Sequence, residues 1–421
     1  MSLAVPARAC GIDFGTANST FGWLRPDQPA LIALEGDKNT LPSVVFFNQE
    51  ERRPAFGRQA LNEYLEGYEG RLMRSLKSLL GSKLLKSETT VLGSAVPFKQ
   101  ILGLFLGELK KRAEAAAGRP FEQVVLGRPV FFVDDDPAAD REAADTLQAV
   151  AGGLGFTDVS FQYEPIAAAF DYESSLTREE LVVIVDIGGG TSDYSLVRLS
   201  PARRLLAERQ DDILATGGVH IGGTDFDRQL SLHGVMPLFG YGSRMKSDAP
   251  MPTSTHLNLA TWHTINAVYA QKHQLALKNM RYDIVDPTGI DRLFRLIEQR
   301  AGHWLAMQIE DSKIALTHDE TRRIDLSRIE TALAADLSRD LFETAIAAQL
   351  ERIRGSVAEL LTRAGLRGEQ VDTLYFTGGS SAVPALRRTI ATLLPEARVV
   401  EGDPFGGIGS GLAIEAQRRY G

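Results

Sequence analysis

The sequence contains a single cysteine, Cys10, in 421 residues. One cysteine excludes an internal disulfide and a zinc site built from thiolates, and it is typical of proteins from a reducing compartment. No run approaches the roughly 18 apolar residues that a membrane helix needs. At the N-terminus no basic segment precedes an apolar run, as it would in an export signal. We therefore expect a cytoplasmic protein.

Positive charge is also scarce. Lysine and arginine together number 46, against 54 aspartates and glutamates, which gives a formal net charge of −8. A chain of this sign has no general attraction for nucleic acid or anionic lipid, so we expect neither a nucleic acid nor a membrane as a partner. Low-complexity segments are missing as well, and 44% hydrophobic with 24% charged residues is typical of a globular protein. The length predicts two or three domains.

Two segments of the chain share one pattern, in which an apolar strand ends in an aspartate and a glycine turn with a threonine leads to a second strand. Asp13 and Thr16 belong to the first segment, Asp186 and Thr191 to the second. Strands and helices alternate after each copy, which predicts two related α/β lobes with a site between them. We place lobe I at residues 1–177, joined by a C-terminal helix at 404–421, and lobe II at residues 178–403.

Apolar periodicity and turn residues predict most of the remaining elements. We expect strands near residues 9–14, 19–24, 30–34, 43–47, 124–132 and 371–376. We expect helices near residues 59–66, 71–80, 101–117 and 338–362, and further helices after residues 384 and 407. Asp136 followed by Pro137 predicts a helix start with an acidic cap. The stretch 241–255 is the one sizeable loop that we expect.

The two glycine turns suit a phosphate group. Without a Cβ atom, the backbone N–H groups of such a turn can approach an anion closely, and a threonine hydroxyl adds a donor. Asp13 and Asp186 would then lie near the same phosphates, which is unfavourable unless a divalent cation is present, so the pattern predicts magnesium. Asp193, across the second turn, could orient metal-bound water or an attacking water.

A third glycine pair, in Gly378-Gly379-Ser380, lies between a predicted strand and a predicted helix, where a nucleoside can approach the backbone. A lone glycine turn is usually a structural hairpin. Two matched turns and this third pair together favour a nucleotide site.

Three other patterns carry less weight. Residues 134–136, three aspartates, are better explained by the helix start than by a metal site. His256, His263 and His273 have spacings that do not stack three ligands on one helical face. Gly188 to Gly190 is not a dinucleotide fingerprint, because another strand follows the turn.

Several phrases of the sequence form a larger pattern when they are taken together. They are residues 11–16, 77–81, 164–168, 186–193, 220–227 and 310–313. With these phrases the chain resembles, over essentially its whole length, the ATPase domain of the DnaK-type (heat shock protein 70) chaperones of the actin-like ATPase superfamily. Residues 161–165, 312–316 and 403–406 are most similar to the short YegD-type proteins of that family. The resemblance implies an α/β, actin-like (ribonuclease H-like) fold whose two lobes flank a nucleotide cleft.

The resemblance also implies roles for single residues. Asp13 and Asp186 would hold magnesium through water, and Lys77 would lie against the γ-phosphate and the attacking water. Glu164 and Asp193 would organise the water network, so the implied catalytic set is Lys77, Glu164, Asp186 and Asp193. The implied phosphate-binding residues are Gly15, Thr16, Ala17, Asn18, Gly188, Gly189, Gly190 and Thr191. The implied nucleoside-binding residues are Gly222, Gly223, Glu310, Lys313, Ile314, Gly378, Gly379, Ser380 and Ala382.

Three departures from the family pattern stand out. Ile314 and Ala382 occupy positions where the family usually has two arginines beside the adenine, and losing such a contact weakens binding by roughly 1–2 kcal/mol. Ala17 replaces a threonine that is common in the first turn. We also expect no substrate-binding domain, because the sequence given ends at Gly421 before the linker and peptide-binding domain of full-length relatives.

The leading hypothesis is a chaperone-like protein that binds ATP and ADP with Mg²⁺, hydrolyses ATP weakly, opens and closes its lobes, and acts on an unknown protein partner or client. Three alternatives stay open: an actin-like filament-forming ATPase, a small-molecule kinase, and a pseudo-ATPase scaffold. The sequence leaves the partner, the turnover rate, the adenine specificity and the oligomeric state undetermined.

Overall fold

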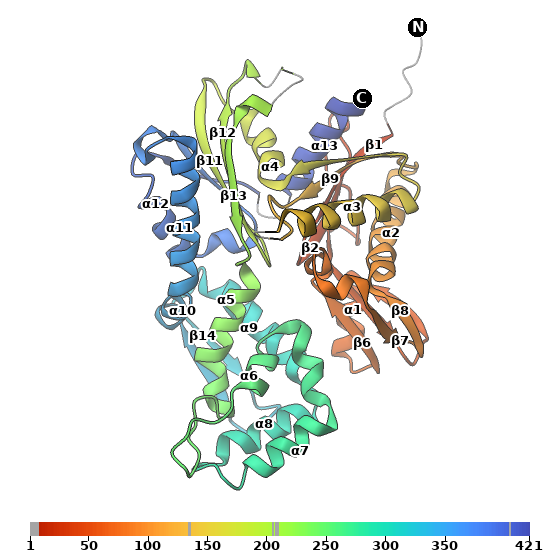
Figure 1. Cartoon of the computed structure of the whole chain (residues 1–421). Coiled ribbons are helices and arrows are strands. Elements are labelled where there is room, and N and C mark those ends of the chain that lie inside the picture. Colours follow the sequence, from red (N-terminus) through yellow and green to blue (C-terminus); the bar gives the residue numbers. More distant parts are fainter. Residues whose placement is uncertain (1–7, 134–135, 204–205, 207–209, 404–405) are drawn as a thin grey trace. The chain divides into compact units, whose positions relative to one another are not determined.

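The computed structural model describes residues 8–133, 136–203, 206, 210–403 and 406–421 (Figure 1). The chain divides into two compact units. Unit 1 comprises the residues up to Gly222 together with Ile353–Ala382 and Leu386–Gly421, and unit 2 comprises Gly223–Arg352 and Val383–Ala385.

The first sheet of unit 1 has five strands in the order β10-β9-β1-β2-β3. Its strands are β1 (Ala9–Phe14), β2 (Asn18–Gly22), β3 (Thr40–Pro42), β9 (Gln123–Arg128) and β10 (Asp158–Tyr163). β1 pairs antiparallel with β2 and parallel with β9. Cys10 is buried on β1, with its Sγ 3.5 Å from the carbonyl oxygen of Gln123, and burial raises the pKa of its thiol.

The second sheet of unit 1 repeats this arrangement, in the order β13-β12-β11-β16-β17. Its strands are β11 (Glu180–Ile187), β12 (Ser192–Leu199), β13 (Ile213–Val219), β16 (Thr373–Thr377) and β17 (Arg398–Glu401). The first strand of the sheet, β11, again pairs antiparallel with its hairpin partner and parallel with a later strand. β11 is apolar over most of its length, which suits a buried strand at the centre of the sheet. It lies between β12 and β16. The repeated pattern that the sequence predicts is therefore present as two five-stranded sheets.

Helices pack on these sheets and between them. They are α2 (Phe98–Ala117), α3 (Pro137–Gly153), α4 (Glu164–Glu173), α11 (Ala347–Ala364), α12 (Pro384–Ala391) and α13 (Gly407–Tyr420). α13 contacts β1 and β9 of the first sheet, and α4 contacts β11 and β12 of the second. α4 and α13 touch each other at Gly411, where a Cβ atom would lie only 1.8 Å from the carbonyl oxygen of Ala167. Glycine is therefore required where these two helices cross.

The remainder of unit 1 corrects two expectations. It contains a three-stranded sheet of β4 (Val44–Asn48), β5 (Arg53–Phe56) and β6 (Gly70–Arg74), a hairpin of β7 (Glu88–Val91) and β8 (Ser94–Pro97), the helix α1 (Gly57–Leu65), and the short helices η1 (Leu76–Leu79) and η2 (Lys83–Lys86). The expected helix 71–80 is wrong, because β6 pairs with β4 there and only one short turn follows. The expected strand 30–34 is reduced to an isolated bridge at Leu31.

The helix start at Asp136 is confirmed. The Asp136 side chain accepts hydrogen bonds from the backbone N–H groups of Ala138 and Ala139, and Pro137 begins α3. The other two aspartates of that run, at positions 134 and 135, lie outside the described residues.

Unit 2 is largely helical. It contains α5 (Gly223–Leu230), a π-helical turn (Ser231–Val235), η6 (Met236–Phe239), α6 (Ser254–Leu259), η7 (Trp262–Tyr269), α7 (Gln271–Met280), α8 (Thr288–Glu298), α9 (Gly302–Leu316), the strands β14 (Thr321–Asp325) and β15 (Ala334–Ser338), and α10 (Arg339–Ala345). The expected helix 338–362 is two helices, α10 and α11, separated at Ile346. Within the described part of the chain, no helix combines the length and the apolar character needed to cross a membrane.

Candidate functional site

The two glycine turns lie next to each other in unit 1. A Cβ atom placed on Gly190 would lie 3.5 Å from the hydroxyl oxygen of Thr16, and one placed on Gly189 would lie 3.5 Å from the Thr16 Cβ. The structure therefore brings together the first predicted phosphate segment, Gly15 to Asn18, and the second, Gly188 to Thr191. Backbone N–H groups from two turns at one point suit an anion with several oxygens.

Two serines near these turns were missed at the level of sequence. The Ser43 hydroxyl donates to the Gly15 carbonyl oxygen over 2.6 Å, and its backbone N–H donates to the carbonyl oxygen of Ala17 over 2.9 Å. The Ser78 hydroxyl oxygen lies 3.6 Å from the position of a Cβ on Gly190. Ser43 comes from a segment with no glycine or acidic motif, so only the fold identifies it. Ser78 lies in the phrase 77–81, whose family resemblance indicated Lys77 but gave no role to Ser78.

Lys77 and Glu164 form a buried ion pair beside the turns. Lys77 lies on η1 and Glu164 is the first residue of α4, and their side chains are 8% and 6% exposed. The Lys77 ammonium group donates to Glu164 Oε1 over 2.5 Å. Burial lowers the pKa of Lys77, but the carboxylates of Glu164 and Asp13 outweigh it, and the net pKa lies above the ordinary value. Lys77 therefore carries a positive charge in this site.

Three more carboxyl groups surround this pair. Asp13 lies on β1, Asp186 near the end of β11, and Asp193 directly opposite Asp186 on β12. Burial, together with the Glu164 carboxylate, raises the pKa of Asp13 and of Asp193 to about 7. Burial and the charges of Glu164 and Asp193 also raise the pKa of Asp186 well above its usual range. One lysine does not balance four carboxylates, so the site favours a further cation.

Asp186 offers a free ligand atom. Its side chain is 4% exposed, and its Oδ1 is buried without a hydrogen-bond partner. A Cβ atom on Gly378, which has φ +80°, would lie 2.3 Å from this oxygen, so only glycine fits beside it. An orphaned carboxylate oxygen in a cluster of acids fits a hard divalent cation such as Mg²⁺. Among the described residues no three acidic, histidine or cysteine side chains are grouped so that they could hold a metal ion directly.

Asp193 is held in a fixed orientation. The backbone N–H of Val130 donates to Asp193 Oδ1 over 2.8 Å, and Thr191 hydrogen-bonds it as well. Val130 follows the end of β9, so a loop of the first sheet orients a side chain of the second. Sequence patterns gave no signal for Val130.

The predicted nucleoside residues fall into two groups. In unit 1, a Cβ atom on Gly222 would lie 2.6 Å from the backbone nitrogen of Gly190, so Gly222 adjoins the second turn. Gly379, Ser380 and Ala382 form the short helix η9 (Gly379–Ala382) directly after Gly378. In unit 2, the predicted residues are Gly223 at the start of α5 and Glu310, Lys313 and Ile314 on α9.

The Lys313 ammonium group is already engaged within unit 2. It lies 2.9 Å from Asp227 Oδ1, and it donates to the carbonyl oxygen of Gly223 over 3.3 Å. Ile314 is 55% exposed on the same helix. The roles predicted for these residues stay predictions.

His256 has a structural role. It is 1% exposed, and its Nε2 lies 3.0 Å from the carbonyl oxygen of Phe239. The side chains of His263 and His273 lie outside the described residues. Within the part of the chain that the structure describes, no metal-binding group includes a histidine.

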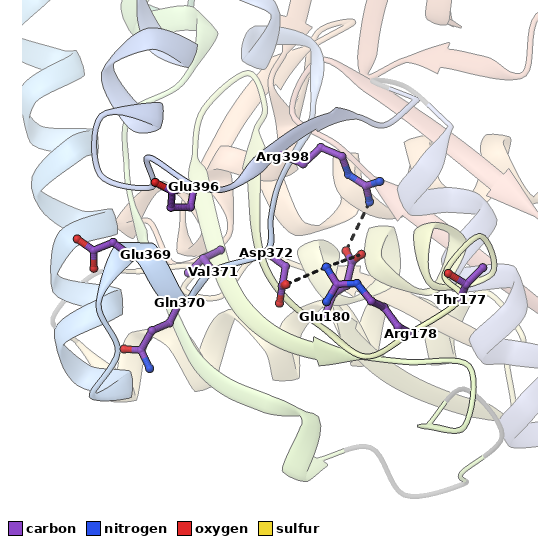
Figure 2. Close-up of a pocket in the computed structure, with 9 residues that line it drawn as sticks. All are labelled: Thr177, Arg178, Glu180, Glu369, Gln370, Val371, Asp372, Glu396 and Arg398. Carbon is purple, nitrogen blue, oxygen red and sulfur yellow. Dashed lines mark hydrogen bonds and ion pairs between the residues drawn. The ribbon is translucent and has the colours of Figure 1, made fainter.

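A hollow of about 440 Å³ lies among the residues labelled in Figure 2. Its lining includes Glu180 at the start of β11, whereas Asp186 lies six residues further along the same strand, roughly 20 Å away. Arg178 and Arg398 pair there with Asp372 and Glu180 over 3.0 and 3.5 Å. These ion pairs tie together the starts of three strands, and the hollow contains none of the predicted site residues.

Comparison with known proteins gives one family and several relatives that are named as chaperones. The family model described as "Hsp70 protein" matches residues 9–99, 85–240 and 285–417. The chaperone protein HscA homolog of Shewanella denitrificans is 24% identical over 428 residues, which cover 97% of this chain and 58% of the relative. The chaperone protein DnaK of Thermus thermophilus is 26% identical over 440 residues, covering 97% and 60%. The chaperone protein HscA of Pectobacterium carotovorum is 27% identical over 430 residues, covering 97% and 58%. The chain thus spans about three fifths of the length of these curated relatives.

Proposed function

The chain belongs to the Hsp70 family and has its actin-like ATPase fold, and from this premise we propose that it is a chaperone-like nucleotide-binding protein that binds Mg-ATP, hydrolyses it slowly to ADP and phosphate, and changes the arrangement of its lobes with the nucleotide state. The lobes are those predicted at residues 1–177 and 178–403. We place the protein in the cytoplasm, with a protein partner or client that senses the nucleotide state.

The observation that carries the proposal is the cluster of buried Lys77, Glu164, Asp186 and Asp193 with half-buried Asp13, beside two glycine turns. Four carboxylates and one lysine are costly to bury without a ligand, so a function is needed to explain them. A phosphate chain with its magnesium ion supplies the missing positive charge and uses the backbone donors of both turns.

Each residue of the cluster has a role in this proposal. Asp13 and Asp186 would hold the magnesium ion through water, and the ion would supply positive charge against the phosphates. Lys77 donates to the terminal phosphate, held in place by Glu164. Asp193, fixed by the Val130 N–H, accepts a hydrogen bond from the attacking water and orients it. Phosphoryl transfer depends mainly on such positioning.

The nucleoside end of the proposed site differs from the family pattern. Ile314 and Ala382 cannot stack a guanidinium on adenine, so the affinity for ATP is expected to be about tenfold lower than with arginines there. The test is the pair of variants Ile314→Arg and Ala382→Arg, each titrated with Mg-ATP and Mg-GTP. A gain for ATP alone would support an adenine site.

The first experiment is a calorimetric titration of Mg-ATP into the protein, with Asp186→Asn as the variant. Wild-type binding that the variant loses would support the site, and phosphate release over hours would support hydrolysis. Absence of binding to the wild type, with ATP and with GTP, would refute the proposal. Binding without phosphate release would favour the pseudo-ATPase alternative.

The filament alternative rests on the actin-like fold. ATP-dependent sedimentation at high speed would support it, and a sedimentation rate that does not change on addition of ATP would count against it. A kinase would transfer phosphate to a sugar or a carboxylate in a substrate screen.

A further inference from the structure

Arg128 stands beside the proposed site without belonging to it. It is the last residue of β9, and its side chain is 16% exposed. Its guanidinium lies over two aromatic rings, 5.1 Å from the centroid of Phe132 and 5.4 Å from that of Tyr163. An arginine held in this way has little freedom to reorient.

The hydrogen bonds of Arg128 reach the loop that follows β9. Its Nε donates to the carbonyl oxygen of Pro129 over 3.1 Å, and one terminal nitrogen lies 3.4 Å from the carbonyl oxygen of Val130. The same terminal nitrogen donates to Asp140 Oδ2 over 2.8 Å. Asp140 lies in the first turn of α3, and its other oxygen accepts the backbone N–H of Phe132 over 2.6 Å. Arg128 and Asp140 thus fix the loop from both ends.

This loop carries the donor that orients Asp193. Val130 N–H donates to Asp193 over 2.8 Å, and Val130 is 4% exposed. A change in the peptide plane at Val130 would therefore move that N–H away from Asp193. On its other side, Arg128 packs on Tyr163, the residue directly before Glu164, and Arg128 pairs in register with Tyr163 in the sheet.

We propose that Arg128 is a positioning residue that fixes the Val130 N–H and the start of α4, and so sets the orientation of Asp193 and Glu164 for ATP hydrolysis. It touches neither nucleotide nor water in this proposal, and it acts only through the loop and Tyr163. The hydrolytic part rests on the proposed function. The structural part, the anchoring of the Val130 N–H, stands on the contacts alone.

The test uses Arg128→Met, which keeps an unbranched side chain beside the rings but removes every side-chain donor. Arg112→Met is the matched control, because Arg112 is also a largely buried arginine, 20% exposed, that pairs with Glu35 and Glu108 on α2. We expect amide hydrogen exchange at Val130, in the nucleotide-free protein, to rise about tenfold in Arg128→Met and to be unchanged in Arg112→Met. We expect kcat for ATP hydrolysis to fall about ten- to hundredfold while the Kd for Mg-ATP stays within about twofold.

The outcomes separate the two proposals. Unchanged exchange at Val130 in Arg128→Met, or equal effects of the two variants, would overturn the role of Arg128. Faster exchange together with a wild type that releases no phosphate would refute hydrolysis and leave the anchoring in place. A parallel rise in Kd and fall in kcat would show a general loss of structure and would also overturn the positioning role. If Arg128→Met does not fold, Asp140→Asn removes the acceptor that holds the guanidinium, and the same exchange increase is expected.

Discussion

Lys77 illustrates at the residue scale how surroundings decide a role. A lysine at this place in a sequence is usually exposed to solvent, yet its side chain is 8% exposed and paired with Glu164. Only the resemblance of residues 77–81 to a family indicated this lysine, since its local pattern predicts a helix that does not form. Asp13 and Asp186 were predicted from the residues themselves, because the strand, aspartate and glycine turn occur twice.

Removing Lys77 is expected to destabilise the nucleotide-free protein. Lys77→Met leaves the buried Glu164 without its partner among three other carboxyl groups, which costs about 3–5 kcal/mol. Adding Glu164→Gln to the same chain should restore much of this loss. Thermal unfolding of the two single variants and the double variant measures the coupling. Additive losses in the double variant would contradict a direct ion pair.

His256 is expected to make the protein less stable in mild acid. Burial lowers the pKa of His256, so between its ordinary pKa of about 6.5 and the lower folded value the unfolded chain binds more protons than the folded one. The stability that this residue contributes is therefore present above pH 6.5 and is lost progressively as the pH falls below that value.

The measurement is the melting temperature at pH 7 and pH 5 for the wild type and for His256→Gln, which keeps a donor for the Phe239 carbonyl. The wild type should lose more stability than the variant on acidification. His318→Gln, at an exposed histidine of the same unit, serves as the control. Equal acid sensitivity of the wild type and His256→Gln would contradict the argument.

At the scale of elements, the positions of strands and helices with strong apolar spacing were predicted well. Elements whose conformation is decided by pairing with a distant segment were predicted less well. β1, β4 and α2 lie close to their expected positions because their apolar spacing is strong. The helix predicted at residues 71–80 was wrong because pairing of β6 with β4 overrides the helical spacing of its apolar residues. The break at Ile346 was also missed, since no proline or glycine marks it.

Two glycines in helices are expected to respond in opposite ways to alanine. Gly411→Ala places a Cβ atom 1.8 Å from the Ala167 carbonyl oxygen and should destabilise the protein by about 3 kcal/mol or more. Gly355→Ala, on the exposed face of α11 with nothing within 4 Å, should stabilise it by about 0.5–1 kcal/mol. Both effects are read from thermal unfolding curves. A neutral Gly411→Ala would mean that α4 and α13 cross less closely than described.

At the scale of the whole molecule, the duplicated pattern was the strongest guide to the fold, because two copies of one phrase imply two similar sheets. The adjacency of the two glycine turns also follows from it. Residues that hold the site in place, such as Ser43, Val130 and Arg128, could not be identified from the sequence. Their role depends on tertiary contacts between distant segments.

Nucleotide is expected to change how proteases cleave the chain. The predicted contacts with ATP come from many separate segments, so binding should protect several loops at once. Limited proteolysis with Mg-ATP, with Mg-ADP and without nucleotide should give three distinguishable fragment patterns. Asp186→Asn should give one pattern under all three conditions. Identical wild-type patterns would contradict a nucleotide-driven change of conformation.

The buried thiol on β1 can report how often the first sheet opens. Cys10 is the sole cysteine, it is fully buried between β2 and β9, and its pKa is raised. An alkylating reagent can therefore modify this protein only after the centre of the first sheet has opened. The ratio of its modification rate to that of a free thiol then gives the equilibrium constant for opening. This ratio can be compared across variants and nucleotide states, and no residue has to be introduced to measure it.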